Sequence, residues 1–148
     1  MLKTETPVCR FFALYAQETA EDNMPAVVSH FADSFLFAGP SGAQPVRASD
    51  FAAALPKRKL LFDKLGSQPA ELIAIHETSL DSRYVLARTT WRFCFQPNNT
   101  PAQQFDTDST FLIDTGLHGT PESDFKILLY LPHHDVMKIL RDRGILQA

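Results

Sequence analysis

Apolar positions near the start of the chain recur with the spacing of an amphipathic helix. Thr6 is a suitable N-cap residue, and Pro7 suits the first helical position, where the missing N–H costs no helical hydrogen bond. Apolar side chains then follow every three or four residues, so the pattern predicts a helix over 7–21. The same spacing after Asn23 predicts a second, shorter helix that ends near Phe31.

The next segment combines a short extended stretch with a third helix. Residues 34–38 are aromatic and apolar, which favours a brief strand, and the glycines and proline of 39–42 favour a loop after it. A third helix is expected to begin at the capping residue Ser49 and to end before Gly66. Pro56 lacks a backbone N–H and clashes with the preceding turn, so we expect it to kink or restart this helix.

After the third helix the apolar period changes from 3.6 to two, which is the period of a β-strand. The run 84–96 shows it most clearly: its odd positions, which include Thr89, Trp91 and Phe93, are mainly apolar, whereas its even positions are mixed. The odd positions are therefore expected to cover the core.

Three further strands and a last helix are expected around this run. Segments 71–78 and 105–114 are predicted to be its antiparallel neighbours, because each is joined to it by a short polar loop. A strand over 125–131 and a helix over 134–143 follow. Helices come first and long strands later, which predicts an α+β protein with helices packed on one face of a sheet.

Composition adds limits on size, partners and location. A chain of 148 residues with 45% hydrophobic content fits one globular domain over 1–148, in which 133–148 forms a C-terminal helical extension. The net charge of −3 argues against nucleic acid and membrane surfaces as partners. Without a signal peptide or a long apolar run, the chain is expected to be cytoplasmic, with Cys9 and Cys94 as reduced thiols.

The order of elements, together with one junction motif, resembles the nuclear transport factor 2-like superfamily. The motif is Phe31-Ala32-Asp33, followed by an aromatic strand and Gly39-Pro40. Over about residues 7–132, the resemblance implies a cone-shaped, strongly curved antiparallel sheet with three N-terminal helices on its concave face. It also implies an apolar pocket inside the cone and a homodimer formed through the outer sheet face. The added C-terminal helix would either close the pocket or build a dimer contact.

Tyr15 is the first candidate for chemistry. It lies on the apolar stripe of the first helix, and its spacing from Phe31 resembles that of the tyrosine that donates an oxyanion hydrogen bond in ketosteroid isomerases of this superfamily. The alternative is a core tyrosine whose hydroxyl bonds to backbone. The isomerase base has no counterpart, because Gly39 occupies its place and Asp33 is the nearest carboxylate. Asp33 is alternatively a turn residue that bonds backbone amides.

Other charged groups leave two further alternatives. His76 shares the parity of Leu72, so it would face the pocket as an acid or base, or else remain a half-exposed strand histidine. Arginines and aspartates share a parity on two neighbouring strands, which resembles the Asp-Arg-Asp set of epoxide hydrolases of this fold. Exposed cross-strand ion pairs explain them better, because the aromatic odd positions of the run 84–96 are expected to face the core. These residues are Arg88, Arg92, Asp106 and Asp108.

No metal or cofactor site is expected. His133-His134-Asp135 resembles a metal cluster, but adjacent side chains do not converge easily and further ligands are missing, so a helix start explains it better. No glycine-rich phosphate loop, serine nucleophile elbow or metalloprotease motif occurs.

The sequence therefore predicts a pocket for an apolar or aromatic small molecule. The residues leave open whether the protein only binds this ligand or acts on it by proton transfer, as an isomerase, dehydratase or cyclase. The alternative is a non-catalytic, dimeric protein-interaction module, which a filled cone would favour over an open cavity. The residues expected to contact the ligand are Phe12, Tyr15, Phe37, Thr89, Trp91, Phe93, Ser109 and Phe111.

Overall fold

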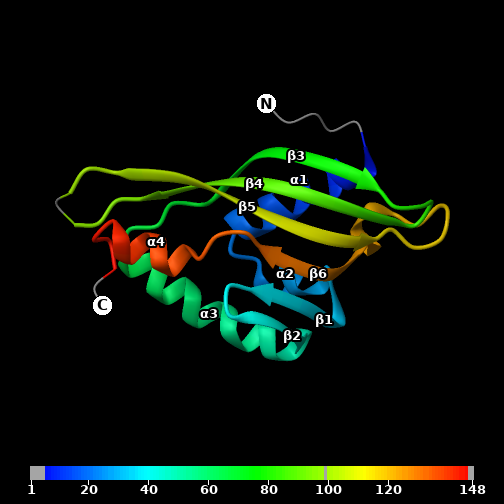
Figure 1. The fold of residues 1–148 in the computed structure, drawn as a ribbon, viewed down its shortest axis with the longest axis horizontal. Helices are drawn as coiled ribbons and strands as arrows, with labels where there is room; N and C mark the ends of the chain where they lie inside the picture. The colour runs from blue at the N-terminus through cyan, green and yellow to red at the C-terminus, as the bar shows by residue number, and fades with distance from the viewer. Residues whose placement is uncertain (1–5, 99, 147–148) are drawn as a thin grey trace.

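The computed structural model describes residues 6–98 and 100–146, which form helices and a six-stranded sheet (Figure 1). In chain order, the elements are α1 (Pro7–Ala20), α2 (Met24–Ser29), β1 (Phe31–Gly39), β2 (Gly42–Arg47), α3 (Ala48–Lys64), β3 (Glu71–Ser79), β4 (Tyr84–Phe95), β5 (Gln103–Asp114), a 3₁₀ turn η1 (Glu122–Asp124), β6 (Lys126–Pro132) and α4 (Val136–Asp142).

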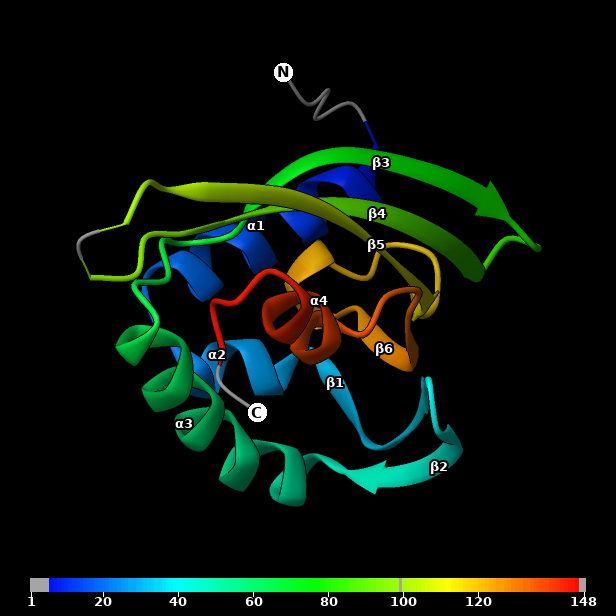
Figure 2. The same ribbon diagram turned by 60° about the vertical axis from the view of Figure 1, so that its left-hand side comes forward.

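The sheet is mixed and open, with the strand order β2-β1-β6-β5-β4-β3. Its long strands pair antiparallel, as predicted, but β1 pairs with β6 in parallel, so the expectation of a wholly antiparallel sheet was wrong at this point. The parallel pair arises because the chain leaves β1 and returns to its flank only after crossing β2, α3 and the β3–β5 meander. Figure 2 shows β3, β4 and β5 arching over the helices, which confirms the cone-like α+β architecture.

The N-terminal helices begin where the capping signals predict. The Thr6 side chain accepts a hydrogen bond from the Cys9 backbone at 3.0 Å, and Asn23 accepts one from Ala26 at 3.4 Å. Helix α3 continues through Pro56 as one helix, so of the two predicted outcomes the restart does not occur. No side chain of α3 is fully buried, so the helix can adjust around the proline without disturbing a packed core.

The sequence pattern missed β2 and underestimated β1. The two strands form a hairpin in register from Ser34 opposite Arg47 to Gly39 opposite Gly42. The turn falls inside the predicted loop, and Gly42 has a φ of 121°, which suits glycine. Strand β2 is an edge strand that contains Pro45. Its residues do not alternate between apolar and polar, so the sequence pattern does not predict a strand here.

Two apolar clusters hold the elements together. The larger one joins α1 and α2 to the concave side of the sheet, with Phe11 and Phe12 fully buried. The smaller one lies where α4 meets the ends of α3, β4 and β5. Its buried members are Phe95, Phe105, Leu140 and Ile145, and Phe62 and Leu65 of α3 pack against them. The C-terminal segment therefore docks α4 against the helical side of the sheet.

Candidate ligand-binding site

A cavity of about 520 Å³ lies between the helices and the concave face of the sheet. This volume is in the range of pockets for small organic ligands. Its wall is mainly apolar and aromatic, with a few polar groups. The aromatic side chains on the wall are Tyr15, Phe37, Phe51, Phe62, Trp91, Phe93, Phe111 and Tyr130.

Most of the residues predicted to contact a ligand lie on this wall. They are Tyr15, Phe37, Trp91, Phe93, Ser109 and Phe111. The prediction was wrong for Thr89 and Phe12, because both residues are fully buried and neither lines the cavity. The Thr89 hydroxyl donates to the Ser109 carbonyl oxygen at 2.9 Å and accepts from Trp91 Nε1 at 2.8 Å, so it orients the tryptophan. Phe12 packs under Phe111, with ring centroids 5.0 Å apart.

Tyr15 projects from α1 into a group of aromatic rings and contributes to the cavity wall. Its ring meets those of Phe31, Trp91 and Phe111 at centroid distances of 6.0 to 6.3 Å. Among residues 6–98 and 100–146, none forms a hydrogen bond with its hydroxyl group. Burial raises the pKa of the Tyr15 phenol, and the nearby Tyr130 phenol raises it further. The hydroxyl therefore stays protonated and is available as a donor.

Tyr130 is a second phenol on the wall, and the sequence pattern does not reveal it. It pairs with Phe37 on one side and Phe111 on the other, and its ring stacks on Phe111 with centroids 4.9 Å apart. The apolar run of β6 is continuous, so it carries no alternation from which the facing side chains could be read.

A buried histidine and a carboxylate form a pair beside Tyr15, which the sequence analysis also missed. Glu18 lies three residues after Tyr15 on α1 and lines the cavity. Its Oε1 is 2.5 Å from Nε2 of His30, and their side chains are 14% and 3% exposed. His30 Nδ1 is buried without a hydrogen-bond partner in the described part of the chain. The i, i+3 spacing of Tyr15 and Glu18 was the available signal.

Helix α3 brings positive charge to the cavity mouth. Lys59 lies between two carboxylates, 2.5 Å from Asp63 and 3.5 Å from Asp22. Arg58 covers the Phe62 ring, with its guanidinium carbon 4.8 Å from the ring centroid. Both cations line the cavity.

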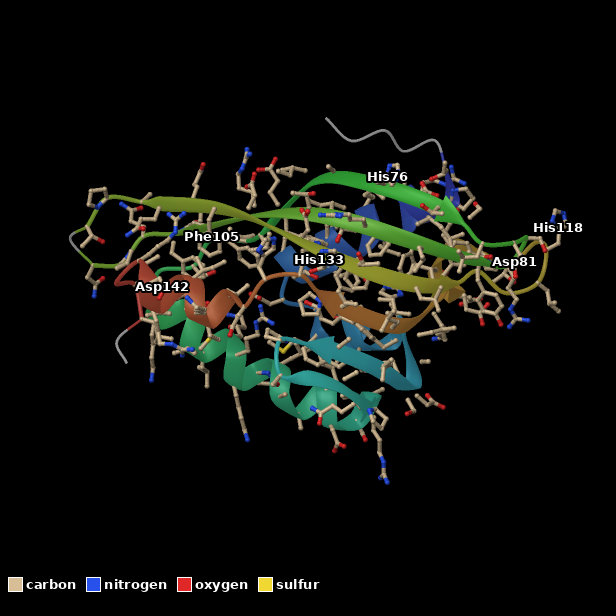
Figure 3. All side chains as sticks on the ribbon, in the orientation of Figure 1. His76, Asp81, Phe105, His118, His133 and Asp142 are labelled. Atoms are coloured by element: carbon tan, nitrogen blue, oxygen red, sulfur yellow. The ribbon has the colours of Figure 1, made fainter. Side chains whose placement is uncertain are left out.

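The structure places His76 and Asp33 away from the cavity. A bulge between Leu72 and Ala74 shifts the register of β3, which reverses the parity on which the His76 prediction relied. His76 is exposed on this edge strand, opposite Arg88 (Figure 3), while Ile75 packs against the core instead. Asp33 is exposed within β1 rather than in a turn, and no hydrogen bond is formed by its side chain within the described residues.

The arginines and aspartates of β4 and β5 form exposed cross-strand ion pairs. Arg88 contacts Asp108 at 2.6 Å, and Arg92 contacts Asp106 at 2.9 Å. The second oxygen of Asp108 accepts from Thr90 at 2.8 Å, so this carboxylate is already engaged. Asp108 contributes to the cavity wall, but Asp106, Arg88 and Arg92 do not, so the four residues form no Asp-Arg-Asp set inside the cavity.

His133 and the two cysteines do not form a metal site or a disulfide within the described residues. His133 shares a 2.7 Å hydrogen bond with Thr110 (Figure 3), and within the described ranges no three His, Cys, Asp or Glu side chains converge as a metal site. Cys9 and Cys94 are free thiols. No described helix is long and apolar enough to span a membrane.

The curved sheet, the helices on its concave side and the cavity between them are typical of cone-shaped α+β proteins. No family model and no curated protein matches the sequence. Solved structures do match, and they confirm the resemblance stated from the sequence: the chain has the nuclear transport factor 2-like, or cystatin-like, fold.

Three of these structures illustrate the range of proteins with this fold. An NTF-2-like protein from Shewanella oneidensis is 10% identical, with a TM-score of 0.60 over 85% of this chain and 95% of that one. The beta subunit of benzoate 1,2-dioxygenase from Burkholderia mallei is 13% identical, with a TM-score of 0.64 over 89% and 91%. A proposed scytalone dehydratase from Novosphingobium aromaticivorans is 9% identical, with a TM-score of 0.65 over 85% and 80%.

Proposed function

We propose that this protein binds an apolar, ring-containing small molecule that carries a hydrogen-bond-accepting oxygen. The observation that carries this proposal is the cavity of about 520 Å³, whose aromatic wall includes the unpartnered hydroxyl of Tyr15. A ligand oxygen that accepts from this hydroxyl adds a hydrogen bond, which contributes about 0.5–1.5 kcal/mol net.

The wall chemistry supports aromatic or fused-ring ligands in particular. Flat rings stack well against phenylalanine, tyrosine and tryptophan faces, and eight such side chains surround this cavity. Proteins with the same fold include a dioxygenase subunit and a proposed scytalone dehydratase, so the fold alone does not select a reaction. An interaction module would need no such cavity, and the open interior therefore favours a ligand.

Leu55 offers a direct test, because it lines the cavity from α3, where no side chain is fully buried. Leu55→Trp is expected to fill part of the cavity without disturbing the core. Leu60→Trp is the matched control, since Leu60 lies on the same helix, is 63% exposed and does not line the cavity. The probes are 2-tetralone, coumarin, flavone and estrone. Their binding is measured by thermal shift and by calorimetric titration.

We expect at least one probe to raise the melting temperature of the wild type and of Leu60→Trp, but not of Leu55→Trp. Ligand at 100 times its Kd adds about 2.7 kcal/mol to folded-state stability, which a melting curve resolves. Tyr15→Phe should weaken the binding of a probe with a carbonyl group by about 5- to 10-fold, which corresponds to the loss of one hydrogen bond. Binding that is equal in Leu55→Trp and wild type, or absent for all four probes, would contradict the proposal.

A further inference from the structure

The cavity wall contains a carboxylate that an uncharged ligand does not require. Glu18 lines the cavity from α1, and its side chain is only 14% exposed. Taking a charged group out of water is costly unless an opposite charge or several hydrogen bonds compensate for the lost solvation. The surroundings of Glu18 therefore decide which kind of ligand this wall favours.

The other carboxylates on the wall have protein partners of their own. Lysine and arginine side chains form ion pairs with three of them, and a backbone N–H of α4 donates to the fourth. These carboxylates are Asp22, Asp63, Asp108 and Asp135. Glu18 differs from them, because among residues 6–98 and 100–146 no lysine or arginine side chain forms an ion pair with it.

The partner of Glu18 is His30, which acts as a neutral donor. Nε2 of His30 is 2.5 Å from Oε1 of Glu18, whereas Nδ1 is buried and has no partner in the described residues. The tautomer with its proton on Nε2 donates to Glu18 and leaves only a lone pair unsatisfied. The doubly protonated ring would bury an unsatisfied N–H, which costs more. His30 therefore orients Glu18 but leaves its negative charge uncompensated.

The second oxygen of this carboxylate is available to a bound molecule. In the described part of the chain, Oε2 of Glu18 forms no hydrogen bond. Aromatic rings line the same cavity, and Trp91 is held in place among them because its indole N–H donates to Thr89 at 2.8 Å. The faces of aromatic rings attract organic cations, and tryptophan does so most strongly. One cavity thus offers a carboxylate oxygen and aromatic faces, which together suit an ammonium group on an organic molecule.

The cations at the cavity mouth do not take this place. Lys59 lies between two other carboxylates, and Arg58 is exposed, with its guanidinium carbon 4.8 Å from the centroid of the Phe62 ring. Neither side chain contacts Glu18. The positive charge that Glu18 lacks is therefore left for a ligand to supply.

We propose that Glu18 binds a protonated amine of the ligand, which makes the ligand class an aromatic or fused-ring amine. This inference rests on the proposed binding function and adds a charged group to the ligand described there. The ammonium N–H donates to Oε2 of Glu18, the ring body packs against the aromatic wall, and the ligand oxygen accepts from Tyr15. Binding brings a positive charge to a carboxylate that has no cationic partner in the protein.

Three probes with one carbon skeleton separate charge from shape. At pH 7, 2-aminotetralin is a cation, 2-tetralone is neutral and tetralin-2-carboxylic acid is an anion. Glu18→Gln is the decisive variant, since glutamine keeps an oxygen that accepts from His30 but carries no charge. Glu21→Gln is the matched control, because Glu21 is an exposed carboxylate at the end of α1 that does not line the cavity. Calorimetric titration measures the Kd of each probe with each protein.

We expect wild type and Glu21→Gln to bind 2-aminotetralin about 10- to 100-fold more tightly than Glu18→Gln does, which is the range for a hydrogen bond to a charged group. The Kd of 2-tetralone should change by less than about 3-fold in Glu18→Gln, because no charge pair is lost. The acid should bind wild type more weakly than the amine does, since Glu18 repels it. Glu18→Asp keeps the charge and should also prefer the amine to the acid, which tests the proposal even if glutamine impairs folding.

The cavity variants locate the bound amine. Leu55→Trp should abolish the binding of 2-aminotetralin, because it fills part of the cavity, and Leu60→Trp should leave the Kd unchanged. Equal binding of the amine by these two variants would place it on the outer surface and would overturn the assignment to Glu18.

The two proposals fail in different ways. If 2-tetralone binds in the cavity but Glu18→Gln leaves the Kd of 2-aminotetralin unchanged, the amine assignment is overturned and the binding function stands. Tighter binding of the acid than of the amine would also overturn the amine assignment, and would indicate Arg58 as the charged contact. If none of the ring probes binds, both proposals are overturned together.

Discussion

Thr89 shows how much a single buried hydroxyl can organise. It is fully buried on β4, donates to the Ser109 carbonyl and accepts from the indole N–H of Trp91. Valine has nearly the same shape but no hydroxyl group, so the indole N–H would lose its acceptor inside the protein.

We predict that Thr89→Val lowers the free energy of unfolding by about 1–3 kcal/mol, measured by urea denaturation. Thr78→Val is the control, because Thr78 is exposed on β3 and should change stability by less than about 0.5 kcal/mol. Equal effects in the two variants would show that the Trp91 hydrogen bond contributes nothing.

At the level of single residues, the sequence predicted apolar site members better than polar ones. Tyr15 and Trp91 follow from periodicity, because an apolar stripe marks the buried face of an element. Glu18 was missed since a carboxylate beside a stripe normally lies in solvent, and its partner His30 is distant in sequence. His76 was misplaced because a β-bulge leaves no mark in the pattern of residue types.

The end of α3 depends on one glycine. Gly66 has a φ of 74°, and a Cβ built on it would lie 2.0 Å from the carbonyl oxygen of Gln96. Gly66 also accepts a backbone hydrogen bond from Gln96 at 2.9 Å, so the helix end is held tightly against the strand end. Gly144 has the same φ of 74° but open space around it.

We predict that Gly144→Ala costs about 1–2 kcal/mol of stability, the cost of left-handed backbone for a residue with a Cβ. Gly66→Ala should cost about 1–3 kcal/mol more than Gly144→Ala, because the Gln96 backbone must move to make room for the Cβ atom. Thermal denaturation of the two variants isolates the close approach, and equal losses would show that the strand end yields freely.

Among the elements, those with strong periodicity or capping signals were predicted, and those defined by pairing were not. Strand β4 and helix α1 follow from alternation and from the Thr6-Pro7 start. Strand β2 owes its existence to pairing with β1, and the parallel contact of β1 with β6 depends on the path of the whole chain. Such long-range pairings have no local signature in a single sequence.

At the scale of the whole molecule, β5 makes the fold sensitive to acid. Hydrogen bonds from Arg92, Arg88 and Arg83 lower the pKa values of Asp106, Asp108 and Asp114, respectively. A carboxylate with a depressed folded-state pKa stabilises the fold above its unfolded pKa, and this contribution disappears as pH falls through the folded value.

Stability should therefore decline as pH falls from about 5 towards 2, as measured by urea denaturation at each pH. Asp114 is the least exposed of the three carboxylates, with 17% of its side chain accessible. Asp114→Asn should be less stable than wild type at pH 7 and should lose less on acidification. Parallel pH curves for the two proteins would rule out this origin. A homodimer through the outer sheet face stays a prediction from the sequence.

Helix α4 links the lifetime of a bound ligand to core residues that do not line the cavity. Val136 and Met137 line the cavity, whereas Leu140 and Ile145, on the same segment, are buried in the second cluster with Phe95 and Phe105. A ligand that leaves past α4 can do so no faster than this segment detaches. The residence time would then be set by the opening rate of the second cluster, and substitutions there would alter ligand release without touching any ligand contact.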